Sequence, residues 1–194
     1  MTRQPDPRRR NEQSRRAILQ AAAELCVQVG FAATTVEGIA ARAGVGKQTI
    51  YRWWPSKAAV LLEYMQDLRA ATADFLDTGD VLTDLVAQTT AVQRLLTSDA
   101  GAIWRGLLVT AQTDDAAASG VRELIERAID DGRARLATAQ RDGQIRADVD
   151  LDIAVELIFG PLYHAWLLRA RTLPEQHMAE VLRTLFAGLA PTPA

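Results

Sequence analysis

The sequence predicts an all-helical protein. Apolar residues recur every three to four positions in long segments whose edges carry proline or glycine. No segment shows the sustained alternation, rich in Val, Ile and Thr, that is typical of strands. With 194 residues, of which 48% are hydrophobic and 24% are charged, the chain has the composition of a globular protein of one or two domains. We therefore expect a compact fold of about nine helices.

Charge is distributed unevenly along the chain, although the formal net charge is only −2. Residues 1–60 hold ten basic and four acidic side chains, a net charge of +6. Residues 61–194 hold twelve basic and twenty acidic side chains, a net charge of −8. The net charge of the whole chain excludes a protein that is basic throughout. The uneven distribution of charge indicates a basic N-terminal region, residues 1–60, on an acidic body.

Composition also argues against several classes of function. Cys26 is the single cysteine and His164 and His177 are the two histidines, so we expect no disulfide, no Cys/His metal site and no cofactor. These residues and scattered carboxylates offer no nucleophile and base, which argues against an enzyme. No uninterrupted apolar stretch approaches the roughly 18 to 20 residues that span a bilayer. No apolar signal core opens the chain, and a cytoplasmic location is therefore expected.

The N-terminal region predicts a basic arm followed by two helices. Residues 1–11 are rich in Pro and Arg and lack an apolar stripe, so we expect them to be disordered. A first helix then runs to about Gly30, with one apolar face made by Ile18, Ala22, Leu25 and Val29. A second helix starts at Thr34–Glu37, where a Thr hydroxyl and the Glu carboxylate three residues on can cap it, and ends near Ala43.

A glycine turn and two more helices follow. Gly44-Val45-Gly46 can make a tight turn because glycine tolerates positive φ. The third helix is expected over Lys47–Trp54, before Pro55, and Ser56 can serve as the N-cap of a fourth. That fourth helix is long and is expected to link a domain at 12–57 to a helical body at 58–190; its stripe is Leu61, Met65, Leu68, Thr72 and Phe75.

Five further helices are predicted for the body. Apolar stripes lie at 82–96, 103–108 and 121–136, separated by breaks at 99–101 and 119–120 and followed by one at 142–143. The last two helices are centred on 155–169 and 178–189, with Thr172-Leu173-Pro174 between them. Pro161 is expected to kink the eighth helix at Gly160.

Two short helices joined by a glycine turn in the basic third of the chain fit a DNA-binding helix-turn-helix. The run includes Thr34-Thr35-Val36-Glu37-Gly38-Ile39-Ala40 and Gly44-Val45-Gly46-Lys47-Gln48-Thr49-Ile50-Tyr51. It resembles the DNA-binding domain of the tetracycline-repressor (TetR) family of bacterial transcription regulators. The resemblance covers about 45 residues, from the first helix to the start of the fourth, and beyond Lys57 it is architectural only.

The resemblance implies contacts to the DNA backbone. Thr35 matches a Thr that bonds a phosphate, and Tyr51 and Lys57 match a Tyr and a Lys that the family uses on the backbone. Arg42 and Trp53 are weaker backbone candidates, and Arg8, Arg9 and Arg10 could extend along a groove. For each cation the alternative is a solvated surface charge.

Base contacts are expected from the start of the third helix. Lys47, Gln48 and Thr49 can reach base edges there, because Gln suits adenine and Lys suits guanine. The chain departs from the family in having Gly46 where Ser usually caps this helix, which costs only a few tenths of a kcal/mol. Ala58 also stands where an acidic residue often follows, so a possible capping box is lost.

The apolar C-terminal helices predict a two-fold homodimer. Residues 157–168 contain no Asp, Glu, Lys or Arg, so part of this helix is expected to be covered by a second copy. The resemblance agrees and implies recognition helices about 34 Å apart. The alternative is a helix central to its own bundle. The expected interface residues are Phe159, Leu162, Tyr163, Trp166, Val181, Leu182, Leu185, Phe186 and Leu189.

The body has more helices than a dimer interface requires, which leaves room for a ligand cavity. Its tentative lining residues are Trp104, Tyr163, His164 and Trp166, with a place in the hydrophobic core as the alternative. The sequence therefore predicts a repressor that a small-molecule effector releases from a palindromic operator, with the fourth helix as the lever. Two alternatives stay open: a helical adaptor that binds protein and not DNA, and a ligand-independent or activating regulator of the same fold.

Overall fold

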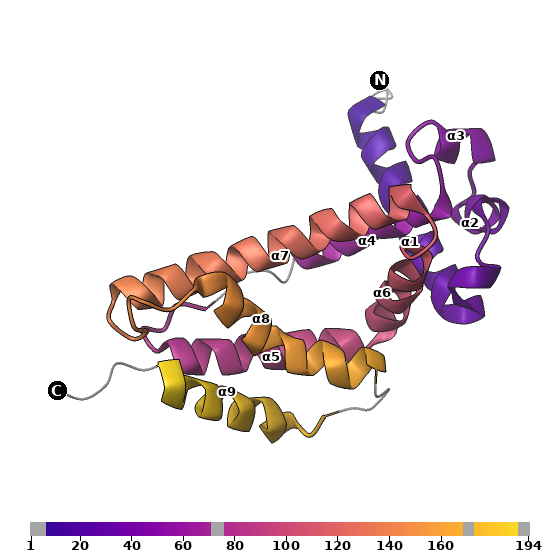
Figure 1. Ribbon diagram of the computed structural model, residues 1–194. Coiled ribbons are helices and arrows are strands. Elements are labelled where there is room, and N and C mark those ends of the chain that lie inside the picture. Colours follow the sequence, from indigo (N-terminus) through magenta and orange to yellow (C-terminus); the bar gives the residue numbers. More distant parts are fainter. Residues whose placement is uncertain (1–6, 71–75, 169–172, 190–194) are drawn as a thin grey trace. The chain divides into compact units, whose positions relative to one another are not determined.

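The computed structural model describes residues 7–70, 76–168 and 173–189. Within these ranges it holds nine α-helices, one π-helical segment and no strand, which confirms the all-helical prediction and the expected number of helices (Figure 1). The elements are α1 (Pro7–Ala33), α2 (Val36–Ala43), α3 (Lys47–Tyr51), α4 (Lys57–Ala70), α5 (Val81–Thr97), α6 (Asp99–Thr110), α7 (Asp115–Arg141), α8 (Leu151–Tyr163), the π segment η1 (His164–Leu168) and α9 (Glu175–Leu189).

The chain forms two compact units. The first unit comprises residues 1–72 and 99–122, and its described helices are α1 to α4, α6 and the start of α7. The second unit comprises residues 73–98 and 123–194, with α5, the rest of α7, α8, η1 and α9. The first unit extends beyond residue 57, the expected domain boundary, because α1 packs against both α4 and α6.

Helix α1 begins earlier than the sequence suggests. Pro7–Asn11, expected to belong to a disordered arm, are helical, whereas residues 1–6 lie outside the described residues. Gly30 has φ +82° and interrupts the helix where its end was expected, and Phe31–Ala33 add one more turn. Ile18 and Cys26 lie on the buried face, and burial raises the pKa of the Cys26 thiol, which fits a small apolar side chain.

The start of α2 is capped one residue later than predicted. Thr35 is the N-cap, and its Oγ1 accepts a hydrogen bond from the Gly38 amide at 3.0 Å. Thr34, which was expected to pair with Glu37, is buried, and its hydroxyl donates to the Gly30 carbonyl at 2.8 Å. Thr35 therefore caps the helix in place of Thr34, and the expected capping box with Glu37 does not form, because Gly38 occupies the third helical position.

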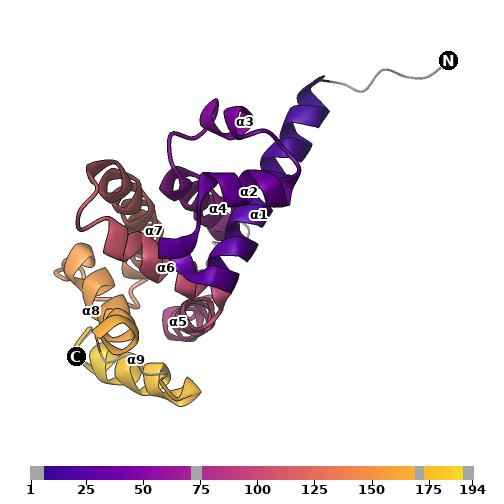
Figure 2. The ribbon, with the colours of Figure 1, turned by 90° about the vertical axis from the view of Figure 1, so that its right-hand side faces the viewer.

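Figure 2 shows the turn after α2 and the short helix α3 that follows it. Gly44 ends α2 with φ +67°, as the glycine turn predicted. Helix α3 ends at Tyr51 and not at Trp54. Pro55 disfavours a helical conformation for Trp54, the residue before it. The Trp54 amide still donates to the Ile50 carbonyl at 2.9 Å, so one turn follows the helix. Ser56 caps α4 as expected, since its Oγ accepts from the Ala59 amide at 3.2 Å.

Gly120 lies inside helix α7 and does not break the chain as predicted. The break predicted at 119–120 lies inside α7, and the chain breaks instead at 111–114, where Asp114 Oδ1 accepts from the Ala117 amide at 2.9 Å. Gly120 is needed for close packing, since a Cβ built on it would lie 2.5 Å from Leu62 Cδ1. The break predicted around 99–101 exists but lies slightly earlier, at Ser98, and α6 starts directly after it at Asp99.

The second unit has an apolar core with one buried ion pair. Leu85, Leu136, Ile158 and Leu182 are fully buried in that core. Asp84 of α5 and Arg135 of α7 form a salt bridge, and both side chains are buried.

Further hydrogen bonds surround this pair, although Arg135 Nη1 is buried without a partner among the described residues. Asp84 accepts from the Thr78 hydroxyl at 2.6 Å and from its amide at 3.2 and 3.3 Å, while Arg135 Nε donates to the Leu76 carbonyl at 3.1 Å. Burial alone would raise the pKa of Asp84, but the hydrogen bonds from Arg135 and Thr78 outweigh it and hold that pKa below its ordinary value.

Helix α8 continues past Pro161 and turns directly into η1, where the helix widens. Leu151–Leu168 is long and apolar enough to cross a membrane by length and composition alone. Asp152 and Glu156 interrupt it, so it is not an uninterrupted apolar stretch of the kind that the sequence argues against. Only 33% of it is buried, and Ile153, Leu157 and Leu168 are exposed. The same composition suits a helix that another protein surface covers.

Candidate nucleic-acid interface

Helix α3 turns one face to the core and another to solvent. Ile50 is completely buried and anchors the helix in the first unit, whereas Lys47 and Gln48 are exposed and Thr49 is half-buried. The Lys47 ammonium lies 3.8 Å from Glu37 Oε1, and both side chains are more than half exposed. Such a surface pair contributes at most about 1 kcal/mol. Lys47 can therefore exchange Glu37 for a nucleic-acid acceptor at small cost.

The N-terminus of α2 carries a second polar group. Thr35 is exposed, and its hydroxyl accepts from the Gly38 amide, so its proton can be donated to another acceptor such as a phosphate oxygen. The amides of the first helical turn also favour an anion at this end. The predicted phosphate contact of Thr35 thus fits its position.

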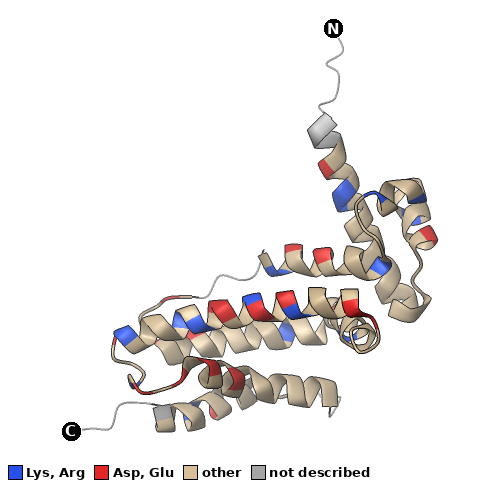
Figure 3. Ribbon diagram, turned by 45° about the horizontal axis from the view of Figure 1, so that its top comes forward, with Lys and Arg blue, Asp and Glu red and all other residues tan. Residues whose placement is uncertain are grey.

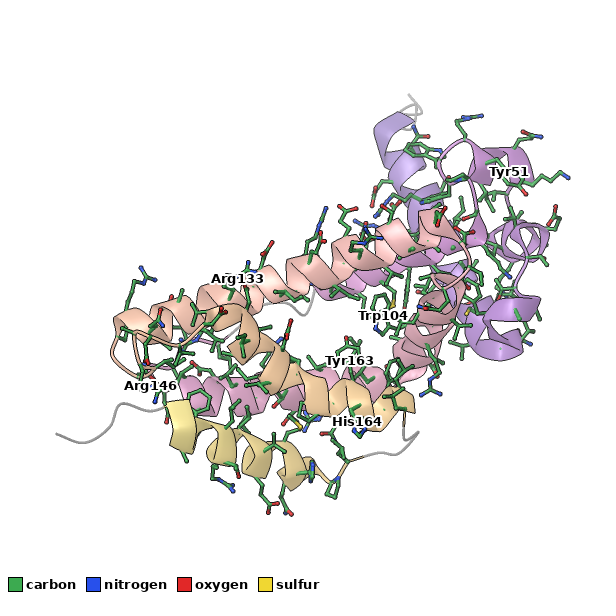
Figure 4. All side chains as sticks on the ribbon, in the orientation of Figure 1. Tyr51, Trp104, Arg133, Arg146, Tyr163 and His164 are labelled. Carbon is green, nitrogen blue, oxygen red and sulfur yellow. The ribbon has the colours of Figure 1, made fainter. Side chains whose placement is uncertain are left out.

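Two aromatic side chains extend the solvent-facing side of this region. Tyr51, labelled on α3 in Figure 4, is 47% exposed. Trp53 is 52% exposed. Trp54 is buried instead, and its Nε1 donates to Glu63 Oε2 at 2.6 Å. Tyr51 and Trp53 can therefore reach a backbone, while Trp54 fixes the turn after α3 to α4.

Arg42, a weaker backbone candidate, is partly engaged by α1. Its Nη2 donates to Gln28 Oε1, and its Nη1 lies 3.5 Å from Glu24 Oε2. These contacts tie the end of α2 to α1. Arg52 was not predicted as a contact residue, yet it lines a cavity of about 40 Å³ with Asn11, Ser14, Thr49 and Trp53.

Lys57 lies in surroundings that the sequence did not suggest. Its ammonium donates to the carbonyl oxygens of Phe31 at 2.7 Å, Ala32 at 3.0 Å and Thr34 at 2.7 Å. It also lies 4.9 Å from the centre of the Phe31 ring. An ammonium has three N–H donors, and all three have acceptors within the chain. The predicted phosphate contact would require these bonds to be given up.

The four tentative ligand residues are not equivalent. Trp104 is buried in α6 of the first unit, while Tyr163, His164 and Trp166 belong to the second. Tyr163 and Trp166 pack edge to face with ring centres 6.0 Å apart. His164, labelled with Tyr163 in Figure 4, is exposed. Of the four, Trp166 alone lines a cavity of about 10 Å³, which is large enough for one water.

Sequence reasoning missed Gln93 in this cavity. Its Nε2 donates to the Leu173 carbonyl at 2.7 Å, but its Oε1 is buried without a partner among the described residues. The cavity wall is otherwise largely apolar and is completed by Leu96, Thr97, Leu162, Ala165 and Trp166. A polar residue in the apolar stripe of α5, between Thr89 and Leu96, was the available signal.

The expected dimer residues divide into two groups. Leu162, Trp166, Leu182 and Phe186 are buried within their own chain, so these four belong to its core, which was the stated alternative. Phe159, Tyr163, Val181 and Leu185 are half-buried. The side chain of Leu189 lies outside the described residues.

Four exposed apolar side chains of this region were not among the expected interface residues, although three of them belong to the charge-free run 157–168. They are Ile153, Leu157, Leu167 and Leu168, all on α8 and η1.

Comparisons with known proteins match both parts of the chain. The family model for "Bacterial regulatory proteins, tetR family" matches residues 18–64, and the model for "Tetracyclin repressor-like, C-terminal domain" matches residues 75–185. The chain is 31% identical over 188 residues to YdeS of Bacillus subtilis, an uncharacterized HTH-type transcriptional regulator, with 96% of this chain and 95% of the relative covered.

Two further proteins extend the similarity. A DNA-binding transcriptional repressor TetR of Mycobacteroides abscessus is 26% identical over 157 residues, covering 80% of this chain and 83% of the relative. The crystal structure of the TetR family transcription regulator SCO0332 superposes with a TM-score of 0.78 at 35% identity, covering 92% of this chain and all of that one.

These relatives are transcription regulators, which agrees with the prediction that the chain is not an enzyme. Regulators of the family bind DNA and small-molecule effectors and form dimers. The family models match both units, and the all-helical fold and the helix-turn-helix at α2 and α3 agree with them. This chain therefore belongs to the TetR family of DNA-binding transcriptional regulators.

Proposed function

We propose that this chain is a cytoplasmic homodimeric repressor that leaves a palindromic operator when a small effector binds its second unit. The observation that carries the proposal is the solvent-facing side of α3, where Lys47 and Gln48 are exposed on a helix whose Ile50 is fully buried. A short helix that is rigidly anchored and polar outside fits the major groove. The repressor named among the relatives supports the direction of regulation.

The polar groups divide into base-reading and positioning contacts. Gln48 can pair with adenine and Lys47 with guanine, and Thr49 can contact either base edge or a thymine methyl. Thr35 at the start of α2, Tyr51 at the end of α3 and Trp53 after it are exposed and would hold the phosphate backbone. Arg42 would reach the backbone only by giving up Glu24 and Gln28.

A two-fold dimer through α8 and α9 is supported by apolar side chains on their surface. Ile153, Leu157 and Leu168 are 49% to 75% exposed, and Phe159 and Tyr163 are half-buried on the same helical region. Covering these side chains with the same surface of a second copy would remove them from water. Two recognition helices would then contact half-sites about one DNA turn apart, or somewhat more.

The effector site is proposed at Gln93 and Trp166. The unpartnered Gln93 Oε1 favours a ligand that donates a hydrogen bond, and the wall of Leu96, Leu162 and Trp166 favours an otherwise apolar molecule. A cavity of about 10 Å³ cannot hold such a ligand, so binding requires the site to open. An effector that binds the opened form would shift the population away from DNA binding.

Selection of bound sequences from random duplexes tests the DNA-binding part of the proposal. We expect enrichment of a palindrome with two half-sites, and two chains on each selected duplex. A pool that stays random after selection in dilute buffer would contradict the proposal. An adaptor that binds only protein would give that result.

The effector is tested separately by a thermal-shift screen of small apolar hydrogen-bond donors. A compound that raises the melting temperature of the wild type should fail to do so with Gln93→Leu, and it should lower affinity for the selected duplex. Transcription from that duplex in the presence and absence of the protein separates a repressor from an activator.

A further inference from the structure

Lys57 occupies a position from which a phosphate contact is expected, yet its ammonium is already fully engaged. Its three donors meet three carbonyl oxygens at 2.7 to 3.0 Å, and the Phe31 ring covers it from a further side at 4.9 Å. Because an ammonium has no fourth N–H, a phosphate could be bound only by breaking one of these bonds.

The three acceptors exist because α1 ends irregularly. Gly30 at φ +82° interrupts the helix, and the last turn at Phe31–Ala33 brings its carbonyls within reach of Lys57. The Phe31 carbonyl also accepts from the Thr34 amide at 3.3 Å. The negative end of a helix also favours a cation. Thr34, whose carbonyl accepts the third bond, immediately precedes Thr35, the N-cap of α2. Lys57, the first residue of α4, therefore fixes the peptide that leads into α2.

The same contact reaches a third helix. Phe31 packs so closely on α6 that a Cβ built on Gly106 would lie 2.5 Å from the Phe31 Cβ and 2.8 Å from its Cγ. The end of α1, the start of α4 and the middle of α6 thus meet around Phe31, all within the first unit.

We propose that Lys57 is a positioning residue for DNA binding: its ammonium group holds the entry to α2 against α4 and makes no phosphate contact. The proposal rests on the proposed DNA-binding function. It assigns Lys57 to the geometry of the helix-turn-helix, while Lys47, Thr35 and Tyr51 keep their expected contacts.

Two substitutions separate a positioning role from a phosphate contact. Lys57→Met removes the charge and the donors at similar length. Lys57→Arg keeps the charge, but its donors are spread over a planar fork and cannot converge on three carbonyls from a single atom. An arginine would serve a phosphate at least as well as a lysine does. The matched controls are Lys47→Met, at an exposed lysine of α3, and Ile18→Val, a mild change in the buried face of α1.

The experiment is a salt titration of each full-length variant on a fluorescent 40-base-pair duplex of random sequence. This probe suffices because counterion release does not depend on sequence. Circular dichroism at the assay temperature and melting curves report folding. Ile18→Val, or a further core variant with an equal loss in melting temperature, shows how much affinity instability alone removes.

We expect both Lys57 variants to stay folded and to lose about tenfold in affinity, more than the matched core variant loses. The slope of log K against log salt should be unchanged for both. A random duplex does not present Lys47 with its preferred guanine, so its ammonium is expected to neutralise a phosphate there, and Lys47→Met should reduce the slope by about 0.9.

The proposal is overturned if Lys57→Met lowers the slope by about 0.9 while Lys57→Arg binds like the wild type, because that result marks a phosphate contact. It is also overturned if neither variant loses affinity, or if the loss equals that of the matched core variant or follows unfolding. A wild-type protein that binds no duplex would instead refute the proposed function itself, and this positioning role with it.

Discussion

Polar residues serve different purposes in the two units. In the first unit, exposed pairs such as Lys47 with Glu37 at 3.8 Å and Arg42 with Glu24 at 3.5 Å contribute little to stability and leave their cations able to change partners. In the second unit, Asp84 and Arg135 are buried together and cannot separate without leaving a charge unpaired. Whether a charged side chain is exposed or buried, more than its type, therefore decides whether it can bind a ligand or stabilises the fold.

Charge along α7 illustrates the same contrast within one helix. Acidic and basic side chains alternate along it, as Figure 3 shows in red and blue, and most of them are solvated. Arg135 alone among the charged residues of this helix is buried, and it pairs with a residue of α5. One buried member of a charged series therefore carries the structural role.

The largest expected effect is the loss of the buried pair. Arg135→Met leaves the Asp84 carboxylate buried without its cation, and we expect it to lower the free energy of unfolding by about 3 to 5 kcal/mol. Urea unfolding followed by circular dichroism measures this change. The double variant Asp84→Leu/Arg135→Met is the control and should recover most of the loss. A single variant within about 0.5 kcal/mol of the wild type would remove the distinction between the units.

An exposed residue of the first unit should affect recognition and leave stability unchanged. Gln48→Ala is expected to weaken binding to the selected duplex by about 1 to 3 kcal/mol and to relax the preference at one base position. Its melting temperature should match that of the wild type. Gln112→Ala, at an exposed glutamine after α6, is the control and should alter neither property. Equal binding by the Gln48 variant would contradict the role of α3.

Low pH should lower the stability of the second unit by protonating Asp84. Because the folded-state pKa of Asp84 lies below its ordinary value, its contribution to stability is complete above the unfolded pKa of about 3.9. That contribution is lost as the pH falls through the lower, folded-state pKa. We expect the melting temperature of the wild type to fall more steeply below about pH 4 than that of Asp84→Leu/Arg135→Met. Parallel curves would show that the pair does not titrate as described.

The smallest expected effect is a gain at the start of α3. Gly46 caps this helix without a side-chain bond, has φ −74°, and has open space where a Cβ would stand. Gly46→Ser should therefore stabilise the protein by a few tenths of a kcal/mol. Gly44→Ser is the matched control and should destabilise it by about 1 kcal/mol, because Gly44 has φ +67°. Melting curves compare the two variants, and a loss with Gly46→Ser would contradict the capping argument.

Much of the first unit could be predicted from the sequence because its signals are local. The glycine turn at Gly44 and the opening of α3 at Lys47 follow from neighbouring residues, and the structure has both. The environment of Lys57 could not be predicted, because its acceptors lie 23 to 26 residues away and depend on the interruption of α1 at Gly30.

The second unit and the packing glycines were harder to predict for the same reason. Asp84 and Arg135 are 51 residues apart and Gln93 and Leu173 are 80 apart, so no periodic pattern pairs them. Gly120 looked like a helix break, but its role is contact with Leu62 of another helix. Local periodicity predicts where helices lie, whereas contacts between helices decide which of their residues matter.

The central claim, that the exposed side of α3 binds duplex DNA, is tested most directly by one titration. Wild-type protein and the variant Lys47→Ala/Gln48→Ala/Thr49→Ala are titrated with the selected duplex between 50 and 200 mM salt. The wild type should bind tightly and lose roughly 10³-fold or more in affinity over that range, whereas the variant should lose its preference for the selected sequence. A wild type that ignores the duplex at 50 mM salt, or a variant that binds with unchanged preference, would contradict the account.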